Sequence, residues 1–256
     1  MITIRTETIA TPLKKGDEFI AASISSPLLN KKEILDGLKL LEQWGLVCRA
    51  ESLVNIKSKW GYLAGNDAIR FSNLHPKKPT KFIIFTRGGW GAARLLERPQ
   101  PWRPGWLLGY SDISSILLSR LSDGFDGGIH GPLLTSLKNE PNWSKERLKS
   151  LLFGLPLPDI HGESWAKGIA TGPLVVTNLT VATHLLGSRH MPNLKGAILI
   201  LEDTFEAPYR IDRMLTHWRL EGSLKNISGL AFGNFNQCND LNSESPQDTF
   251  DLEEIL

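Results

Sequence analysis

Short apolar runs alternate with stretches of helical periodicity along most of the chain. Residues 31–44 place an apolar side chain at every third or fourth position, which predicts an amphipathic helix that ends at Gly45. Apolar runs predict buried strands at 18–23, 46–50, 81–86 and 106–110. A second helical pattern follows at 112–121. Strands and helices that alternate in this way favour a mostly parallel α/β sheet.

The pattern changes between residues 140 and 172, where Pro and Gly crowd a stretch with little periodicity. Beyond it, the pattern again predicts strands and helices, at 173–176, 179–186, 197–201, 211–220 and 229–233. We therefore predict an N-terminal parallel-sheet α/β domain over 1–150, a linker over 151–168, and a smaller β-rich α/β domain over 169–256.

Composition and charge exclude several classes of protein. The chain has 29 basic and 27 acidic residues, a formal net charge of +2, which gives no bulk case for nucleic-acid binding. No apolar run approaches the ~20 residues that span a bilayer, and the N-terminal residues lack the apolar core of a signal peptide. The two cysteines, Cys48 and Cys238, are far apart and form no metal or redox motif. We expect a cytoplasmic globular protein that binds neither membrane nor nucleic acid.

A Gly-Tyr-Ser sequence ends the strand at 106–110 and leads directly into a helix. A strand that turns sharply into a helix at a serine is the geometry of a nucleophile elbow, which lifts the hydroxyl of Ser111 above the sheet. The next backbone amides, from Asp112 on, would then face a developing oxyanion. The second Gly of the usual elbow motif is replaced by Ile113, and a helix N-cap is the simpler interpretation of the same pattern.

Two other segments lie at the carboxyl ends of predicted strands. Residues 86–94 read Thr-Arg-Gly-Gly-Trp-Gly-Ala-Ala-Arg, and glycines at Gly88, Gly89 and Gly91 allow a backbone to approach a ligand closely. A tight strand-to-helix turn explains the same glycines equally well. In the second half, Glu202 and Asp203 end an apolar strand, where a carboxylate can orient a histidine or cap a helix or turn.

Taken in order, these segments resemble the LD-carboxypeptidase and microcin-immunity family of serine peptidases. The resemblance rests on Arg87-Gly-Gly-Trp-Gly-Ala-Ala-Arg-Leu-Leu, Gly109-Tyr-Ser-Asp-Ile, His130-Gly-Pro, Leu201-Glu-Asp and Pro208-Tyr-Arg-Ile-Asp-Arg-Met-Leu, and it spans residues 12–238. It implies a cytosolic homodimer with a Ser-His-Glu triad and without metal or cofactor.

Carried over to this sequence, the resemblance makes Ser111 the nucleophile and Glu202 the triad acid. The amides of Gly88, Gly89 and Asp112 would form the oxyanion hole. His130 would lie near the active centre without being the base. Arg210, in the Tyr-Arg-Ile-Asp-Arg motif, is a candidate for binding substrate.

The catalytic histidine is the point of departure from the family. The family places it after one more helix and strand than this sequence contains, so we expect it beyond Leu256 and the 256 residues to be truncated. A helix that begins at 248 and ends on two apolar residues fits that expectation. A serine without its base would lose several powers of ten in rate.

The resemblance implies hydrolysis of the LD bond to a terminal D-alanine in cytosolic murein peptides, as in peptidoglycan recycling. One alternative is an immunity hydrolase that cleaves a peptidyl-nucleotide toxin, for which Trp143 and Trp165 are candidates for an aromatic platform. Simple exposure or packing explains both tryptophans more easily. Another alternative is an inactive peptide-binding relative.

Overall fold

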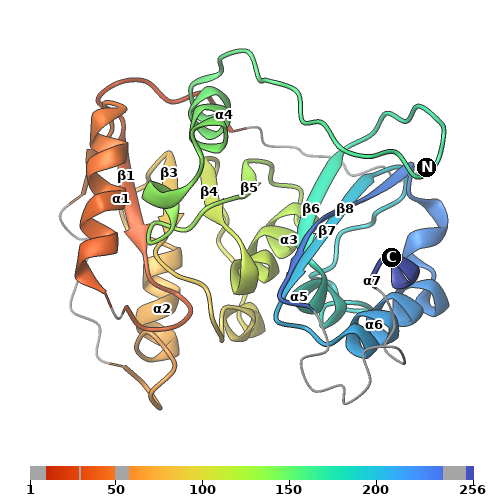
Figure 1. The fold of residues 1–256 in the computed structure, drawn as a ribbon. Coiled ribbons are helices and arrows are strands. Elements are labelled where there is room, and N and C mark those ends of the chain that lie inside the picture. The colour runs from red at the N-terminus through yellow and green to blue at the C-terminus, as the bar shows by residue number, and fades with distance from the viewer. Residues whose placement is uncertain (1–9, 29, 50–57, 239–251) are drawn as a thin grey trace. The chain divides into compact units, whose positions relative to one another are not determined.

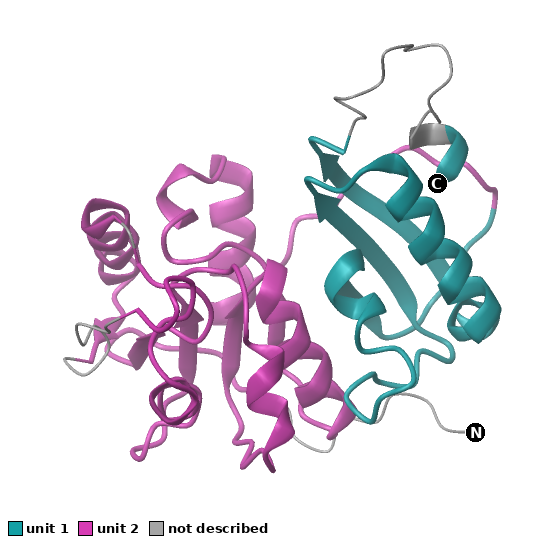
Figure 2. Cartoon of the chain, turned by 90° about the horizontal axis from the view of Figure 1, so that it is seen from below, with its two compact units in different colours: residues 1–5, 168–256 teal, residues 6–167 magenta. Residues whose placement is uncertain are grey.

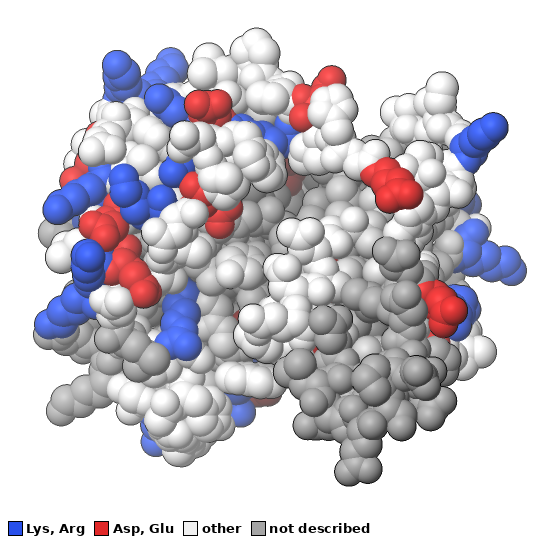
Figure 3. Space-filling model, in the orientation of Figure 1, with Lys and Arg blue, Asp and Glu red and all other residues white. Residues whose placement is uncertain are grey.

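The computed structural model describes residues 10–28, 30–49, 58–238 and 252–256 of the chain. They fall into two compact units, one running from residue 6 to 167 and the other containing residues 168–256 (Figure 2). Basic and acidic side chains are interspersed over the visible face of the first unit rather than gathered into one stripe (Figure 3). None of the helices in the described ranges is long and apolar enough to cross a membrane.

The unit formed by residues 6–167 is built on a five-stranded parallel sheet with the order β2-β1-β3-β4-β5 (Figure 1). Its strands are β1 (Glu18–Ala22), β2 (Val47–Cys48), β3 (Phe82–Phe85), β4 (Trp106–Gly109) and β5 (Gly128–His130). Because all five strands run in the same direction, the segments that follow them emerge at one edge. That carboxyl edge is where open α/β sheets bind their ligands.

Helices α1 (Lys31–Gln43), α2 (Asp67–Leu74) and α3 (Ser114–Ser122) link these strands, with short 3-10 helices at Ala93–Glu97 and Ser111–Ile113. A third 3-10 helix (Leu137–Asn139) and α4 (Asn142–Phe153) follow β5. One face of the sheet and helices α1 and α4 share an apolar core in which Phe19, Phe82, Leu41 and Leu152 are completely buried. Asn30 begins α1 by accepting a hydrogen bond from the amide of Lys32.

The second unit contains a three-stranded parallel sheet with the order β6-β7-β8. Its elements are β6 (Leu174–Asn178), α5 (Leu179–Thr183), β7 (Ile198–Thr204), α6 (Pro208–Glu221), a 3-10 helix at Ser223–Asn226, β8 (Gly229–Asn236) and α7 (Leu252–Ile255). Leu199, Leu201 and Asp203 form the buried face of β7. Trp218 of α6 is completely buried and donates a hydrogen bond from Nε1 to Thr183 Oγ1 at 2.8 Å.

These observations confirm the predicted fold class of a parallel-sheet α/β domain with a second, smaller sheet. Each strand and helix predicted outside 140–172 has a counterpart, except that the start of the last helix at 248–251 lies outside the described residues. The structure corrects the first boundary of the linker predicted over 151–168. Helix α4 fills 142–153, so residues 151–153 are helical. Its sequence shows weak periodicity because only Leu148 and Leu152 are buried.

The apolar core predicts that substitutions of two leucines of α1 have very different effects on the free energy of unfolding. Leu41 is completely buried, whereas Leu35 is 52% exposed. Leu41→Ala should lower the free energy of unfolding by about 2–5 kcal/mol because it leaves a cavity. The matched control Leu35→Ala should change it by less than about 0.5 kcal/mol. Urea unfolding followed by circular dichroism measures both, and equal effects would contradict the assigned core.

Candidate active site

Ser111 occupies a strained turn between β4 and α3. Its φ angle is 61°, a left-handed conformation that costs a residue other than glycine about 1–2 kcal/mol. Such strain typically marks functional sites, and a sharp strand-to-helix turn at a serine is the nucleophile-elbow geometry. Tyr110 and Ile113 occupy the cap positions of the 3-10 helix and of α3, and neither cap uses a side-chain hydrogen bond. The structure therefore disfavours the alternative in which Ser111 serves as a helix cap.

The glycine-rich loop after β3 lies directly against this serine. A Cβ atom placed on Gly88 would lie 3.2 Å from Ser111 Oγ and 3.1 Å from Ser111 Cβ. At Gly89, φ is +116° and an added Cβ would lie 2.0 Å from Ser26 Oγ. The close approach to Ser111 therefore favours glycine at position 88. At position 89 glycine is favoured both by the lack of space beside Ser26 and by the positive φ angle. The loop backbone reaches the nucleophile candidate as the sequence predicts.

The side chain of Asp112 holds the loop to the elbow. Its Oδ2 accepts hydrogen bonds from Ala92 N at 2.9 Å and from Ser25 Oγ at 2.6 Å. Burial raises the pKa of this carboxyl, and the two hydrogen bonds partly offset the rise. The sequence pointed only to the backbone amide of Asp112. Its carboxylate links three segments: those after β1, β3 and β4.

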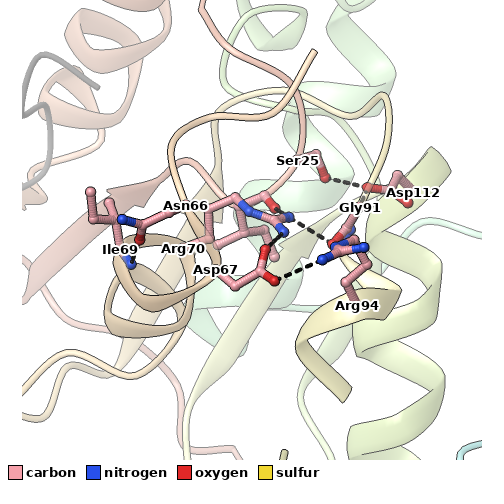
Figure 4. A network of polar contacts seen from close by, with 10 residues as sticks. Ser25, Asn66, Asp67, Ile69, Arg70, Gly91, Arg94 and Asp112 are labelled. Carbon is pink, nitrogen blue, oxygen red and sulfur yellow. Dashed lines mark hydrogen bonds and ion pairs between the residues drawn. The ribbon is translucent and has the colours of Figure 1, made fainter. Parts of the chain in front are cut away.

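Arg70 of α2 holds the same loop through a hydrogen bond to its backbone. The sequence alone gave no sign of this role. The guanidinium is completely buried, and Nη1 donates to Gly91 O at 2.6 Å and to Ile24 O at 2.7 Å. Nη2 pairs with Asp67, whose second oxygen accepts from Arg94 Nη2 at 3.0 Å (Figure 4). These two arginines, Arg94 first, lower the pKa of Asp67. The i, i+3 spacing of Asp67 and Arg70 signals a helical pair, but no local pattern connects Arg70 with a loop 21 residues away.

His130 ends β5 and is paired in register with Gly109 of β4. It is half-buried, with Nδ1 3.4 Å from Ser114 Oγ and its ring 6.2 Å from that of Tyr110. The structure thus places His130 on the strand next to the elbow, rather than in a loop. Its role beside the reaction centre stays a prediction.

Glu202 and Asp203 lie on opposite faces of β7 in the other unit. Asp203 is buried and accepts hydrogen bonds from Thr180 N at 2.8 Å, Thr180 Oγ1 at 2.7 Å and Asn178 Nδ2 at 3.1 Å. It therefore fixes the start of α5, the cap role that the sequence allowed. Glu202 is only partly buried, and a Cβ on Gly233 would lie 3.2 Å from Glu202 Cβ. The role of Glu202 as the triad acid stays a prediction.

Arg210 lies in the first turn of α6 and is exposed. Its Nη1 is 3.5 Å from Glu206 Oε2, and Nε donates to Tyr209 OH at 3.2 Å. Within their own unit, these contacts give Arg210 a surface position. Substrate binding by Arg210 stays a prediction, as does the approach of Ser111 to Glu202, which belongs to the other unit.

A parallel sheet with a strained serine at the carboxyl end of an inner strand is typical of serine hydrolases. Comparison with known proteins identifies the family. The LD-carboxypeptidase N-terminal domain matches residues 19–131, and the LD-carboxypeptidase C-terminal domain matches residues 171–256. The chain belongs to the LD-carboxypeptidase family of serine peptidases, and the matched ranges include Ser111 and Glu202.

Individual relatives agree with this assignment. A putative carboxypeptidase of Synechocystis is 44% identical, over 89% of this chain and 76% of its own length. The murein tetrapeptide carboxypeptidase of Pseudomonas aeruginosa is 33% identical, over 72% of this chain and 66% of its own length. The structure of MccF in complex with glutamyl sulfamoyl guanosine superposes with a TM-score of 0.79 at 20% identity, covering 97% of this chain and 85% of that one. The last comparison shows a shared fold.

Arg70 and Arg94 both pair with Asp67, and we expect them to contribute unequally to the stability of the protein. Arg70→Met should lower the free energy of unfolding by about 1–3 kcal/mol, since it leaves two buried carbonyls and Asp67 without their donor. Arg94→Met removes the more exposed partner of Asp67 and should destabilise the protein less than Arg70→Met, because solvent screens an exposed pair. Urea unfolding of both variants measures the difference. An equal or larger loss in Arg94→Met would show that Arg70 does not anchor the loop.

Asp112 predicts a pH dependence of stability. Because its pKa is raised, the folded protein binds this proton more tightly than the unfolded chain, so its contribution to stability falls as the pH rises from about 4 through the raised pKa. Asp112→Asn removes the charge while its amide oxygen can accept both hydrogen bonds. We expect wild type to lose stability relative to this variant as the pH rises from about 4 through the raised pKa of Asp112. Unfolding curves at a series of pH values test this, and a constant difference would contradict it.

Proposed function

We propose that this protein is a serine carboxypeptidase that hydrolyses the LD bond to a terminal D-alanine in murein peptides. The observation that carries the proposal is the left-handed backbone of Ser111 with Gly88 against its hydroxyl, at the carboxyl edge of the larger sheet. The name of the Pseudomonas aeruginosa relative, a murein tetrapeptide carboxypeptidase, supports the substrate class. A cytosolic role in peptidoglycan recycling and a homodimer, which the resemblance implies, are part of the proposal.

In the proposed reaction, Ser111 Oγ attacks the carbonyl carbon at the L-configured centre of the penultimate diamino acid. The amides of Gly88, Gly89 and Asp112 stabilise the negative oxygen of the tetrahedral intermediate. A histidine oriented by Glu202 takes the proton from Ser111 and passes it to the leaving amine of D-alanine. Water then hydrolyses the ester and regenerates the serine hydroxyl. Arg210 is proposed to bind a substrate carboxylate, for which the guanidinium geometry is suited.

The second candidate is an immunity hydrolase, favoured by the shared fold with MccF, the microcin C7 self immunity protein. Trp143 on α4 and Trp165 are 63% and 61% exposed, so neither is committed to an apolar core. Assays with a murein tetrapeptide and with aspartyl sulfamoyl adenosine, the ligand of another MccF structure, separate the two functions. We expect faster turnover of the tetrapeptide. Faster cleavage of the sulfamoyl compound would select the immunity function.

The nucleophile assignment predicts the effect of removing one oxygen atom. Ser111→Ala should abolish D-alanine release from a murein tetrapeptide while the circular dichroism spectrum stays unchanged, because the hydroxyl forms the covalent intermediate. Activity that survives Ser111→Ala would refute the assignment.

Gly88 predicts a loss of activity from the addition of one methyl group. In Gly88→Ala the new Cβ would lie 3.2 Å from Ser111 Oγ, so the loop or the hydroxyl must shift. We expect kcat/KM to fall by about a hundredfold or more, the effect of losing an oxyanion donor. The matched control is Gly162→Ala, because an added Cβ at Gly162 meets nothing within 4 Å. A rate in Gly88→Ala equal to that of the control would contradict the close packing of loop and nucleophile.

A further inference from the structure

The segment that follows β1 contacts both loops of the candidate oxyanion hole. Two of its residues, Ser25 and Ser26, are buried, with 0% and 7% of their surfaces exposed. They belong to the same unit as the elbow and the glycine-rich loop. Because buried polar groups are almost always hydrogen-bonded, the partners of these two serines indicate which parts of the site they hold.

The side chain of Ser25 holds the elbow. Its Oγ donates a hydrogen bond to Asp112 Oδ2 at 2.6 Å (Figure 4). The same carboxylate oxygen accepts from Ala92 N at 2.9 Å. Asp112 is also the residue whose backbone amide is a candidate oxyanion donor. The hydroxyl of Ser25 therefore helps to set the position of one of the donors.

The backbone of Ser26 holds the glycine-rich loop. Its N–H donates to Gly88 O at 3.2 Å. The carbonyl of Gly88 and the amide of Gly89 share one planar peptide, and no peptide bond in the described part of the chain is cis. In a trans peptide the C=O and the N–H point in opposite directions. A fixed Gly88 carbonyl therefore also fixes the direction of the Gly89 N–H, another candidate donor.

The segment that carries these two serines is itself anchored to other elements. Ser25 O accepts from Ala64 N at 2.8 Å, and Ile24 O accepts from the buried Arg70 Nη1 at 2.7 Å. Pro27 follows directly, which restricts the backbone of Ser26 as well as its own. Since the segment is held on both sides, its bonds to the elbow and to the loop fix the two relative to each other.

We propose that Ser25 is a positioning residue for catalysis, which keeps the amides of Asp112 and Gly89 directed at one point beside Ser111. The inference rests on the proposed function, because an oxyanion hole has a role only where Ser111 attacks a carbonyl carbon. Two donors on separate loops stabilise the same oxygen only while the loops keep one relative position. Ser25 ties the elbow to the neighbouring residue that holds Gly88, and it acts through Asp112 without making or breaking a bond.

The test compares two substitutions that each remove one completely buried hydroxyl. Ser25→Ala removes the bond to Asp112, whereas the matched control Ser119→Ala removes a hydroxyl within α3. The release of D-alanine from a murein tetrapeptide is measured for both. We expect Ser25→Ala to lower kcat by about tenfold to a hundredfold and to change KM by less than about twofold, since the donors act when the oxyanion forms. In Ser119→Ala both constants should stay within about twofold of the wild-type values.

Amide hydrogen exchange followed by NMR gives a second readout that does not depend on the reaction. In Ser25→Ala the amide of Ala92, which donates to Asp112, should exchange at least about tenfold faster than in wild type, because the carboxylate is held less firmly. Ser119→Ala should leave this rate unchanged. If Ser25→Ala does not fold, Ser25→Cys replaces it with the same expectations, since a thiol fills the site and is only a weak donor.

An unchanged kcat in Ser25→Ala, or an equal fall in Ser119→Ala, would overturn the positioning role and leave the proposed hydrolysis intact. A rise in KM at constant kcat would also overturn it, because it would assign Ser25 to substrate binding. If the wild-type protein releases no D-alanine, the proposed function fails. The exchange rate of the Ala92 amide then decides by itself whether Ser25 holds the elbow to the loop, and an unchanged rate refutes that tie.

Discussion

The left-handed backbone of Ser111 is the constraint on which the arrangement of the larger unit depends. A serine adopts φ near 61° only where the surrounding structure over-determines it, because the conformation costs about 1–2 kcal/mol. Strand β4 fixes the residue on one side and the 3-10 helix that precedes α3 fixes it on the other. The next residue, Asp112, then ties the turn to two neighbouring loops through a buried carboxylate. The strain is thus compensated by hydrogen bonds made one residue away.

The glycine-rich loop is the second partner of this turn, and its backbone has to approach the serine closely. A side chain would be tightly packed at Gly88 and would clash at Gly89, so the loop backbone needs support from other segments. Arg70 supplies them by donating to Gly91 O from within the protein, and Asp67 compensates its charge. A buried guanidinium is costly unless its charge and its donors are compensated. The carbonyls of Ile24 and Gly91 and the carboxylate of Asp67 match the Nη atoms of Arg70, whereas its buried Nε has no hydrogen-bond partner among the described residues. The two sides of the candidate oxyanion hole are in this way held by one polar network (Figure 4).

The sequence predicted the fold well because its signals are local. Buried parallel strands appear in the sequence as apolar runs, and α1 shows a clear apolar stripe. The alternation of strands and helices could therefore be predicted from the sequence. Residues 151–153, the end of α4, are predicted as linker because this helix buries only Leu148 and Leu152 and therefore shows weak periodicity. The same division applies to the candidate site. The elbow and the glycines are contiguous motifs, whereas the contacts of Arg70 join segments distant in the chain, and only the folded structure brings them together.

The account makes Ser111 the residue that carries the substrate's acyl group, and that can be measured directly. A murein tetrapeptide is mixed with the active protein, the reaction is quenched with acid during turnover, and the protein is digested and analysed by mass spectrometry. An ester adduct is expected on the peptide that contains Ser111, with at least as much D-alanine released as ester trapped. Several other serines lie close by in the sequence or in the network, namely Ser25, Ser26, Ser114 and Ser115. An adduct on any of these, with Ser111 unmodified, would contradict the account.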